Sequence, residues 1–314
     1  MKVAVLGAGF SGLALSWYLL QKGCEVTLYD AKGIGAGASG IASGLLHPYP
    51  GEGVKRSLYA DEAMKETLAL LHLAQKFSID QVADFSGLMR HATPDQSETL
   101  KKHITTYGDV DLISNDLFLI KSGVSVYSTV YLDGLYKACL SKGLTFCVKK
   151  ITQINELVEY SHRFFALGAG IFAFPDMQIR KVNPVKGQAL ICEWPLYLPP
   201  LDKAVLGKGH IVPLGKGLVH LGSTYERGLL DEGTSLENTL QALAPLAKEL
   251  VPAWNEINPI AVRSGIRLAP IGHYLPFFNK VGSQDWVLTG MGSRGLLYHA
   301  YIAKQLVEAA FFNS

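Results

Sequence analysis

The sequence predicts an α/β fold with a parallel sheet built from the N-terminus and an antiparallel sheet in the second half of the chain. Two observations carry this prediction. The first 30 residues read as strand, glycine-rich turn, helix and strand, and residues 209–225 alternate as antiparallel strands do. The length of 314 residues allows one large domain or two ordinary ones. A hydrophobic fraction of 48% excludes an intrinsically disordered chain.

The apolar run over residues 2–6 predicts a parallel strand, because such strands are covered on both faces. A GxGxxG pattern follows it. Gly7 permits a tight turn, Gly9 lets the backbone approach a pyrophosphate, and Gly12 lets the next helix pack closely on the strand. The helix N-terminus would then face the anion.

The helix after these glycines ends at Gly23, a C-terminal cap, and a second strand over 25–29 leads to Asp30. Asp30 follows Gly12 by about the twenty residues expected for a carboxylate that binds ribose hydroxyls. With strand, glycines, helix and acid in register, the segment predicts a dinucleotide site. An acid with no arginine beside it argues against a 2′-phosphate, which leaves NAD or FAD.

Residues 33–53 favour FAD over NAD. This segment is too rich in glycine and serine for the next helix of a plain NAD-binding unit. Its backbone amides and the hydroxyls of Ser39 and Ser43 could contact phosphate oxygens or a flavin edge. A flexible surface loop is the alternative, but Ile41, Leu45 and Leu46 favour a packed loop. We therefore expect an ordered cofactor loop.

Charge and cysteine content exclude several classes of protein. A net charge of +2 gives no general indication of nucleic acid or an anionic membrane as partner. The four cysteines form no CxxC pair and no metal-like cluster with histidine, so we expect buried, reduced thiols. No secretory signal and no apolar run of membrane-spanning length is recognised. The sequence thus predicts a soluble, cytoplasmic protein without a metal site.

Further along the chain, apolar spacing predicts helices over 57–77, 129–142, 235–250 and 296–310, and strands over 144–151, 163–169 and 286–289. The first of these helices would bury Leu58 with Met64, Leu68 and Leu71.

Several segments resemble the D-amino-acid-oxidase-type FAD-dependent oxidoreductases, a family that includes glycine oxidase and sarcosine oxidase. They are GAGFSGLALSWYLLQKGCEVTLYD from residue 7, GASG from 37, SGIR from 264, LPF from 275 and GMGSRGL from 290. More narrowly, GLLHPYPG, PVKGQ, GSTY and GMGSRGLL are similar to the oxidase domain of MnmC, the bifunctional enzyme that modifies the tRNA wobble uridine. The resemblance runs in order over nearly the whole chain.

The resemblance implies a Rossmann-like FAD-binding domain interleaved with an α+β substrate domain that contains an antiparallel sheet. The FAD-binding domain would comprise residues 1–85, 125–175 and 262–314, and the substrate domain residues 86–124 and 176–261. The region around Arg263 lacks the cysteine that anchors flavin covalently in sarcosine oxidase, so the FAD is expected to be non-covalent.

Arg267 and Arg294 are the candidate catalytic cations. An arginine fork can bind a carboxylate through two hydrogen bonds, and the family uses an arginine at the position of Arg267 to hold the substrate carboxylate. Arg294 either lies close to the substrate, as its match in glycine oxidase does, or forms a salt bridge that positions its turn. The alternative for Arg267 is likewise a structural ion pair.

The remaining candidates surround the expected flavin. Amides of Gly292, Gly295 and Leu296 at a helix N-terminus would stabilise an anionic reduced ring. Tyr225, His47, Lys186 and Gln188 could line the active site, although a single histidine in an apolar loop is more often structural. The full set expected to bind the cofactor is Gly7, Gly9, Phe10, Ser11, Gly12, Asp30, Ala31, Ala38, Ser39, Gly44, Leu45, Val148, Gly168, Gly170, Gly187, Gly292, Ser293, Arg294, Gly295 and Leu296.

The predicted activity is oxidation of the C–N bond of a carboxylate-bearing amine, either an amino acid or an N-carboxymethyl amine. A hydride would pass to the flavin, the imine would hydrolyse, and oxygen would reoxidise the flavin. A small amine and oxygen are thus the expected partners. The alternatives are an MnmC-like oxidase acting on carboxymethylaminomethyl-uridine in tRNA, a non-catalytic flavin-binding protein, and, least favoured, an NAD-dependent reductase.

Overall fold

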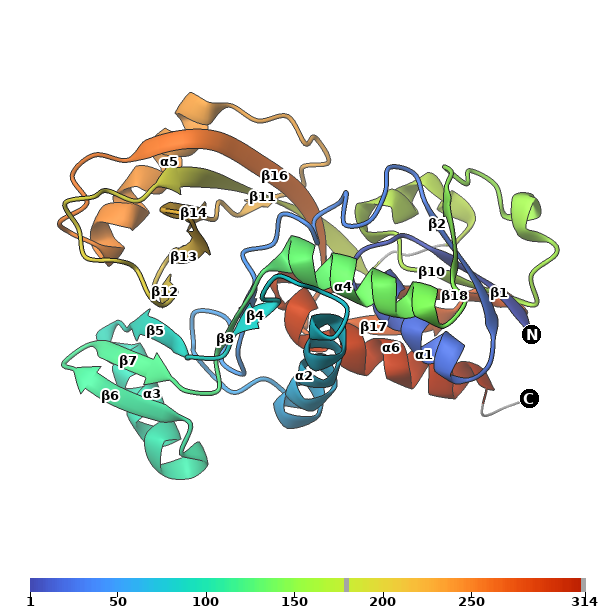
Figure 1. The fold of residues 1–314 in the computed structure, drawn as a ribbon, viewed down its shortest axis with the longest axis horizontal. Coiled ribbons are helices and arrows are strands. Elements are labelled where there is room, and N and C mark those ends of the chain that lie inside the picture. Colours follow the sequence, from blue (N-terminus) through green and yellow to red (C-terminus); the bar gives the residue numbers. More distant parts are fainter. Residues whose placement is uncertain (178–180, 312–314) are drawn as a thin grey trace.

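The computed structural model describes residues 1–177 and 181–311 of the chain. Two large sheets lie at opposite ends of the molecule, with most of the helices between them (Figure 1). The expected α/β class, with a parallel sheet and a second sheet that is mostly antiparallel, is confirmed.

The first sheet has six strands in the order β17-β18-β10-β1-β2-β9, all parallel except β17, which runs antiparallel to β18. A bidentate ion pair between Arg163 and Asp285, both buried, joins two of its strands. The strands are β1 (Lys2–Leu6), β2 (Glu25–Asp30), β9 (Thr145–Val148), β10 (His162–Phe165), β17 (Phe277–Lys280) and β18 (Asp285–Thr289).

Both faces of this sheet are covered, which explains the continuous apolar run in β1. Val3 and Val5 face a helical layer, whereas Ala4 and Leu6 face the segment between β9 and β11. The helical layer comprises α1 (Phe10–Gln21), α2 (Ala60–Gln75), α4 (Ser128–Ser141) and α6 (Gly295–Phe311). The opposite segment carries the short 3-10 helices η1 (Ile154–Leu157), η2 (Gly168–Ala173) and η3 (Pro175–Met177).

The second sheet has nine strands, eight of them in the order β15-β11-β14-β13-β12-β5-β7-β6, with β16 paired to β11 as well. The pairs are antiparallel except β12 with β5. The strands are β5 (Leu88–His91), β6 (Val110–Ser114), β7 (Leu117–Ile120), β11 (Val182–Glu193), β12 (Val205–Leu206), β13 (His210–Gly215), β14 (Leu218–Gly222), β15 (Glu226–Arg227) and β16 (Asn258–Pro270).

One face of this sheet is closed by α5 (Leu236–Leu250), whose apolar residues Leu243, Ala247 and Leu250 pack in one cluster with Leu190 and Ile211. The helix begins where the Ser235 hydroxyl accepts a hydrogen bond from the Asn238 amide. Helix α3 (Pro94–Tyr107) packs beside β6. A third, small sheet joins β3 (Leu45–Leu46), β8 (Val124–Val126) and β4 (Ala83–Asp84).

Several predicted boundaries need correction. The helix expected over 57–77 begins only at Ala60, because Tyr59 adopts φ +56° outside the helical region, and Leu58 is 59% exposed rather than buried. The strands expected over 144–151 and 163–169 are shorter, and the second one ends before the chain turns into η2. The expected boundary between the two domains at residue 262 falls inside strand β16, which runs without a break across it. The division into two domains stays a prediction.

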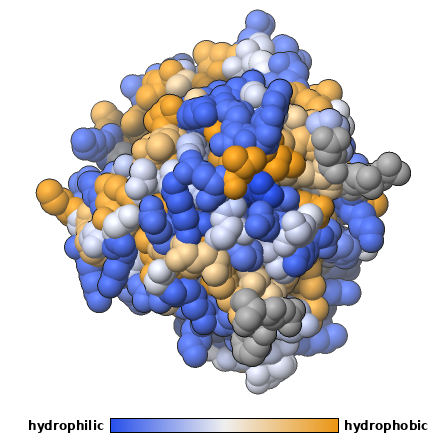
Figure 2. Space-filling view, turned by 90° about the vertical axis from the view of Figure 1, so that its right-hand side faces the viewer, coloured by the Kyte–Doolittle hydropathy of each residue, from blue (hydrophilic) through white to orange (hydrophobic). Residues whose placement is uncertain are grey.

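Among the described residues, no helix combines the length and hydropathy needed to span a bilayer. Figure 2 shows the end of the molecule that carries both termini in Figure 1, where hydrophilic and hydrophobic residues are interspersed. Scattered apolar residues of this kind are ordinary on a globular protein surface.

Candidate functional site

The turn after β1 holds three glycines against neighbouring atoms. Gly7 has φ +98°, and a Cβ there would lie 2.4 Å from the carbonyl oxygen of Ala166. A Cβ on Gly12 would lie 1.7 Å from the carbonyl oxygen of Gly7. Gly9 is the N-cap of α1 and carries no side chain, so the helix N-terminus stays open to an anion apart from the Phe10 amide, which donates to Ser39 Oγ.

Asp30 is fixed at the end of β2 by three backbone amides. Its Oδ2 accepts a hydrogen bond from Ala8 N at 2.8 Å, and its Oδ1 accepts from Lys32 N at 2.8 Å and Gly33 N at 2.9 Å. The carboxylate therefore joins the glycine turn to the loop that follows β2. Its outer edge lines a cavity.

The loop over residues 33–53 is packed, as the sequence predicts. Ser39 Oγ accepts a hydrogen bond from Phe10 N at 3.1 Å, at the start of α1. Gly44 has φ +78°, and its carbonyl oxygen accepts from Val126 N at 2.7 Å. Leu46 then enters the small sheet and is fully buried.

These segments surround a cavity of about 310 Å³ between the six-stranded and nine-stranded sheets. Most of the predicted cofactor residues, together with Arg267, lie in its wall. Those brought together there are Gly7, Gly9, Phe10, Ser11, Asp30, Ala38, Ser39, Gly44, Leu45, Gly168, Gly170, Gly187, Arg267, Gly292, Ser293, Gly295 and Leu296. The predicted residues outside the wall are Gly12, Ala31, Val148, Lys186, Tyr225, Arg294 and His47.

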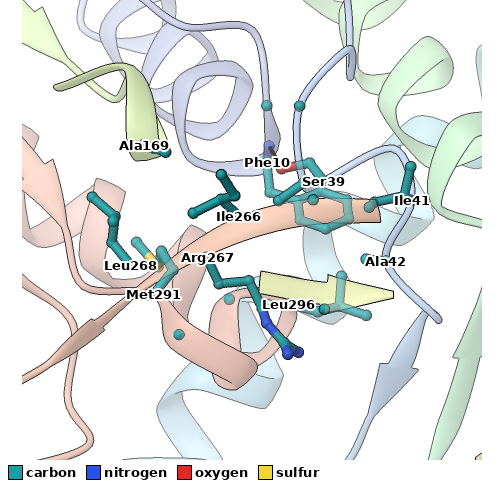
Figure 3. A pocket seen from close by; sticks show the side chains of 18 of the residues that line it. Phe10, Ser39, Ile41, Ala42, Ala169, Ile266, Arg267, Leu268, Met291 and Leu296 are labelled. Carbon is teal, nitrogen blue, oxygen red and sulfur yellow. Dashed lines mark hydrogen bonds between the residues drawn. The ribbon is translucent and has the colours of Figure 1, made fainter. Parts of the chain in front are cut away.

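Arg267 is the unpaired cation of the cavity. In Figure 3 its guanidinium lies well apart from Phe10 and Ser39. Its Nε and Nη2 are buried and have no hydrogen-bond partner among the described residues. Burial lowers the pKa of Arg267. The absence of a side chain at Gly187 makes room for it, since a Cβ there would lie 2.8 Å from Nη2. An unpaired fork of this kind matches a carboxylate.

His47 is buried near the cavity but does not line it. Its Nδ1 accepts a hydrogen bond from Tyr49 N at 3.3 Å. Burial, with the nearby charges of Arg90 and Arg294, lowers the pKa of His47 to about 3. The imidazole is therefore neutral and a weak base, which favours its structural interpretation.

Arg294 points away from the cavity that its neighbours line. Its Nη2 donates to the carbonyl oxygen of Pro50 at 3.3 Å, and its guanidinium carbon lies 4.3 Å from the ring centroid of Tyr274. Tyr225 is half exposed, with its ring centroid 5.5 Å from the guanidinium carbon of Arg267. Val148 is 64% exposed.

Lys186 and Gln188 bind neighbouring loops with their side chains. Lys186 Nζ donates to the carbonyl oxygen of Gly233 at 2.5 Å, and Gln188 Nε2 donates to Glu226 Oε1 at 2.8 Å. Gln188 lies in the cavity wall, whereas Lys186 does not.

Sequence reasoning missed two histidines in the cavity wall, His210 on β13 and His220 on β14. Their rings stack with centroids 5.4 Å apart and an interplanar angle of 9°. Burial and neighbouring cations lower the pKa of each, to about 4 for His220. The signal was the alternating hairpin itself, which places both histidines on one face.

The described residues contain no group of three or more His, Cys, Asp or Glu side chains that could hold a metal ion. All four cysteines are free; Cys24, Cys139 and Cys192 are buried, and Cys147 is partly exposed.

Comparison with known proteins shows which family has this sequence and fold. Residues 2–309 match the model of the family described as "DAO: FAD dependent oxidoreductase". Over 98% of the chain the sequence is 26% identical to the tRNA 5-methylaminomethyl-2-thiouridine biosynthesis bifunctional protein MnmC of Maricaulis maris, of which the chain spans 51%. Over 94% of the chain it is 25% identical to glycine oxidase of Pseudomonas aeruginosa, covering 91% of that protein.

The chain thus spans about half the length of the MnmC relatives it matches. Among solved structures, glycine oxidase from Geobacillus kaustophilus shares the fold with a TM-score of 0.83 at 20% identity, covering 98% of this chain and 94% of that one. Because the family model matches nearly every residue, the chain belongs to the DAO family of FAD-dependent oxidoreductases.

Proposed function

We propose that the protein oxidises the C–N bond of a carboxylate-bearing amine, with FAD bound non-covalently in the cavity and oxygen as electron acceptor. The observation that carries this proposal is the guanidinium of Arg267, whose Nε and Nη2 are buried without a hydrogen-bond partner among the described residues. A buried, unpaired cation is costly, and a ligand carboxylate would satisfy it.

The cavity wall fits FAD. The open N-terminus of α1 suits a pyrophosphate, and the Asp30 carboxylate suits a ribose. Gly9 makes room for Ser39 beside this turn, because a Cβ there would lie 2.7 Å from Ser39 Oγ. Amides at the start of α6, from Gly292 to Leu296, would interact favourably with negative charge on a flavin.

Bound in this cavity, FAD would supply an acceptor for the hydride on the carbon next to the amine nitrogen. Arg267 would bind the substrate carboxylate and so fix which hydrogen faces the cofactor. Its positive charge would also disfavour a protonated amine beside it, and the neutral amine is the reactive form. Water then hydrolyses the imine to a carbonyl compound and an amine.

A second candidate is the carboxymethylaminomethyl group of a modified tRNA uridine. The match to MnmC over nearly the whole chain favours it. That group also presents a carboxylate beside an amine nitrogen, so Arg267 would serve both substrates.

The test is the visible spectrum of the purified protein, followed by anaerobic addition of glycine, sarcosine and other small amino acids. We expect a yellow protein that releases FAD only on denaturation and bleaches with one of these amines, and that forms hydrogen peroxide when air is admitted. Bleaching only by tRNA that carries the modified uridine would establish the second candidate. A yellow protein that ignores every amine would be a non-catalytic flavin-binding protein, and a colourless protein that cannot be reconstituted would exclude FAD.

A further inference from the structure

One face of the nine-stranded sheet carries the unpaired polar atoms of the cavity. Residues paired directly across strands point to the same face. Ala189, Gly222 and His210 form one such row, and Gly187 and Gly265 form the next row on that face. Arg267 and His220 lie on the same face, two residues further along their strands.

This face is built from small residues, so long side chains can lie flat on it. The Nη2 of Arg267 covers Gly187, and the Nε2 of His210 covers Gly222, since a Cβ on either glycine would lie within 2.9 Å of these atoms. The cofactor loop closes the opposite side, because a Cβ on Gly265 would lie 2.5 Å from Ile41 Cδ1. The space between loop and sheet is thus narrow, with polar groups at two points.

The register fixes the separation of those two points. Gly187 lies two residues from Ala189, the partner of Gly222. With about 3.4 Å per residue and about 4.8 Å between strands, the two glycines are about 8 Å apart. The Arg267 and His210 nitrogens above them are therefore separated by the length of a small molecule.

The histidines contribute unpaired atoms of their own. His210 Nε2 and both ring nitrogens of His220 are buried and make no hydrogen bond of good geometry with the described residues, and His220 is only 4% exposed. The Ile41 backbone nevertheless lies close enough to His220 to raise its pKa against the effect of burial. Each neutral imidazole offers one N–H donor and one acceptor. The cations nearest to the pair are Arg267 and Arg263. The carboxylates in the cavity wall are Asp30, at the α1 end, and Glu232, which is exposed.

From this arrangement we infer that the substrate has a second carboxylate, on the other side of its amine nitrogen, which accepts hydrogen bonds from His210 while Arg267 binds the first. His220 stacks on His210 and positions it. The inference deepens the proposed function and rests on it for the amine. It assigns an N-carboxymethyl amino acid or similar dicarboxylic amine in place of glycine or sarcosine, which have one carboxylate.

The test uses the FAD-loaded protein and two ligands that cannot undergo amine oxidation. Oxydiacetate carries two carboxylates on either side of an ether oxygen, and methoxyacetate carries one. Their dissociation constants are measured by calorimetry and by the change in flavin absorbance. We expect oxydiacetate to bind at least about tenfold more tightly, the ratio that about 1.4 kcal/mol supplies. Because neither ligand turns over, the result stands apart from the amine oxidase assay.

In His210→Phe the ratio of the two constants should fall to about 1, whereas His210→Gln, which keeps an N–H donor, should retain most of it. Flavin content and thermal midpoint check that both variants fold. Should His210→Phe fail to fold, the test uses His210→Gln and His220→Phe instead. We then expect the ratio of the two dissociation constants to fall further in His220→Phe than in His210→Gln. Equal binding of the two ligands by the wild-type protein, or a ratio that survives His210→Phe, overturns the inference.

Discussion

The two ends of the cavity treat their polar groups in opposite ways. At the α1 end, Asp30 accepts three backbone hydrogen bonds and Ser39 accepts one from Phe10. At the sheet end, Arg267 and the two histidines, His210 and His220, keep buried nitrogens with no partner among the described residues. The pairing of polar side chains is completed by the chain itself at the α1 end, whereas at the sheet end we propose that a ligand completes it.

The two ends therefore differ in the free-energy cost of their buried polar groups. A satisfied network rigidifies a site, and an unpaired buried group costs roughly 1–3 kcal/mol. The cost falls at the sheet end, where we propose that the substrate binds. Unpaired groups there would make binding selective, because they reject molecules that lack the matching atoms.

The largest expected effect is at the completed end. Gly12→Ala places a Cβ 1.7 Å from the Gly7 carbonyl, a backbone atom that cannot move aside cheaply. We expect the purified variant to lose bound FAD almost completely, as measured by the ratio of flavin to protein absorbance. Gly53→Ala is the matched control, because Gly53 lies outside the cavity wall and the atom nearest to a Cβ there, Lys55 Cγ, is at an ordinary 3.7 Å. A variant at Gly12 that keeps full flavin would refute the role of this contact.

At the other end, Arg267→Met removes the cation without filling its place with another polar group. We expect the dissociation constant for methoxyacetate to rise about 100-fold, the loss typical of a buried charge pair. The flavin content should stay that of the wild type, because Arg267 lies away from the α1 end (Figure 3). Unchanged affinity would make Arg267 a structural residue.

Two buried histidines sharpen the comparison. His299 on α6 is fully partnered: Tyr131 Oη lies 2.7 Å from its Nε2 and the Leu296 carbonyl oxygen 2.9 Å from its Nδ1. His220 has only the backbones of Ile41 and of His220 itself near its ring nitrogens among the described residues, and neither makes a hydrogen bond of good geometry. Replacement by leucine should therefore cost about 2 kcal/mol of unfolding free energy at His299 and near zero at His220, in urea titrations at pH 7.5. Equal losses would contradict the comparison.

The same histidines predict a pH dependence. Burial lowers the pKa of both His299 and His220 to about 4, below the value of 6.5 in an unfolded chain. Between these values the unfolded state binds protons that the native state does not, so stability is complete above pH 6.5 and falls toward pH 4. Each leucine variant should reduce that fall, as measured by thermal midpoints at pH 7.5 and 5.

The smallest expected effect concerns Tyr225, which is half exposed beside Arg267. Loss of a partly exposed cation–π contact costs about 0.5–1 kcal/mol, so Tyr225→Ala should weaken methoxyacetate binding about two- to fivefold. Tyr225→Phe keeps the ring and should bind as the wild type does. A loss as large as that of Arg267→Met would place the tyrosine in the binding site itself.

The glycine turn and Asp30 could be predicted from sequence because the contacts involved are local. Gly7 and Gly12 touch each other, and the chain returns to Asp30 within one strand–helix–strand unit. The motif around Arg267 could also be recognised from sequence. The space that its guanidinium occupies could not, because that space depends on Gly187, about eighty residues earlier. Fold class follows from the same local patterns.

The histidine pair could not be predicted in this way. His210 and His220 meet only because the turn between β13 and β14 sets a register that pairs Val212 with His220 and His210 with Gly222. A shift of one residue would turn either side chain to the face covered by α5. Arg294 shows the converse, since its sequence neighbours Ser293 and Gly295 line the cavity whereas its own side chain donates to the Pro50 carbonyl oxygen.

The six-stranded sheet pairs strands that are far apart in the sequence, and this order has a consequence for folding during translation. Strand β10 reaches its partner β18 only after the residues between them have been made, and the buried pair Arg163 and Asp285 is separated by 122 residues. At about 5–20 residues per second, a ribosome needs on the order of ten seconds to make that interval. Throughout this time one edge of β10 is bare, which makes the nascent chain a natural client for chaperones that shield unpaired strands.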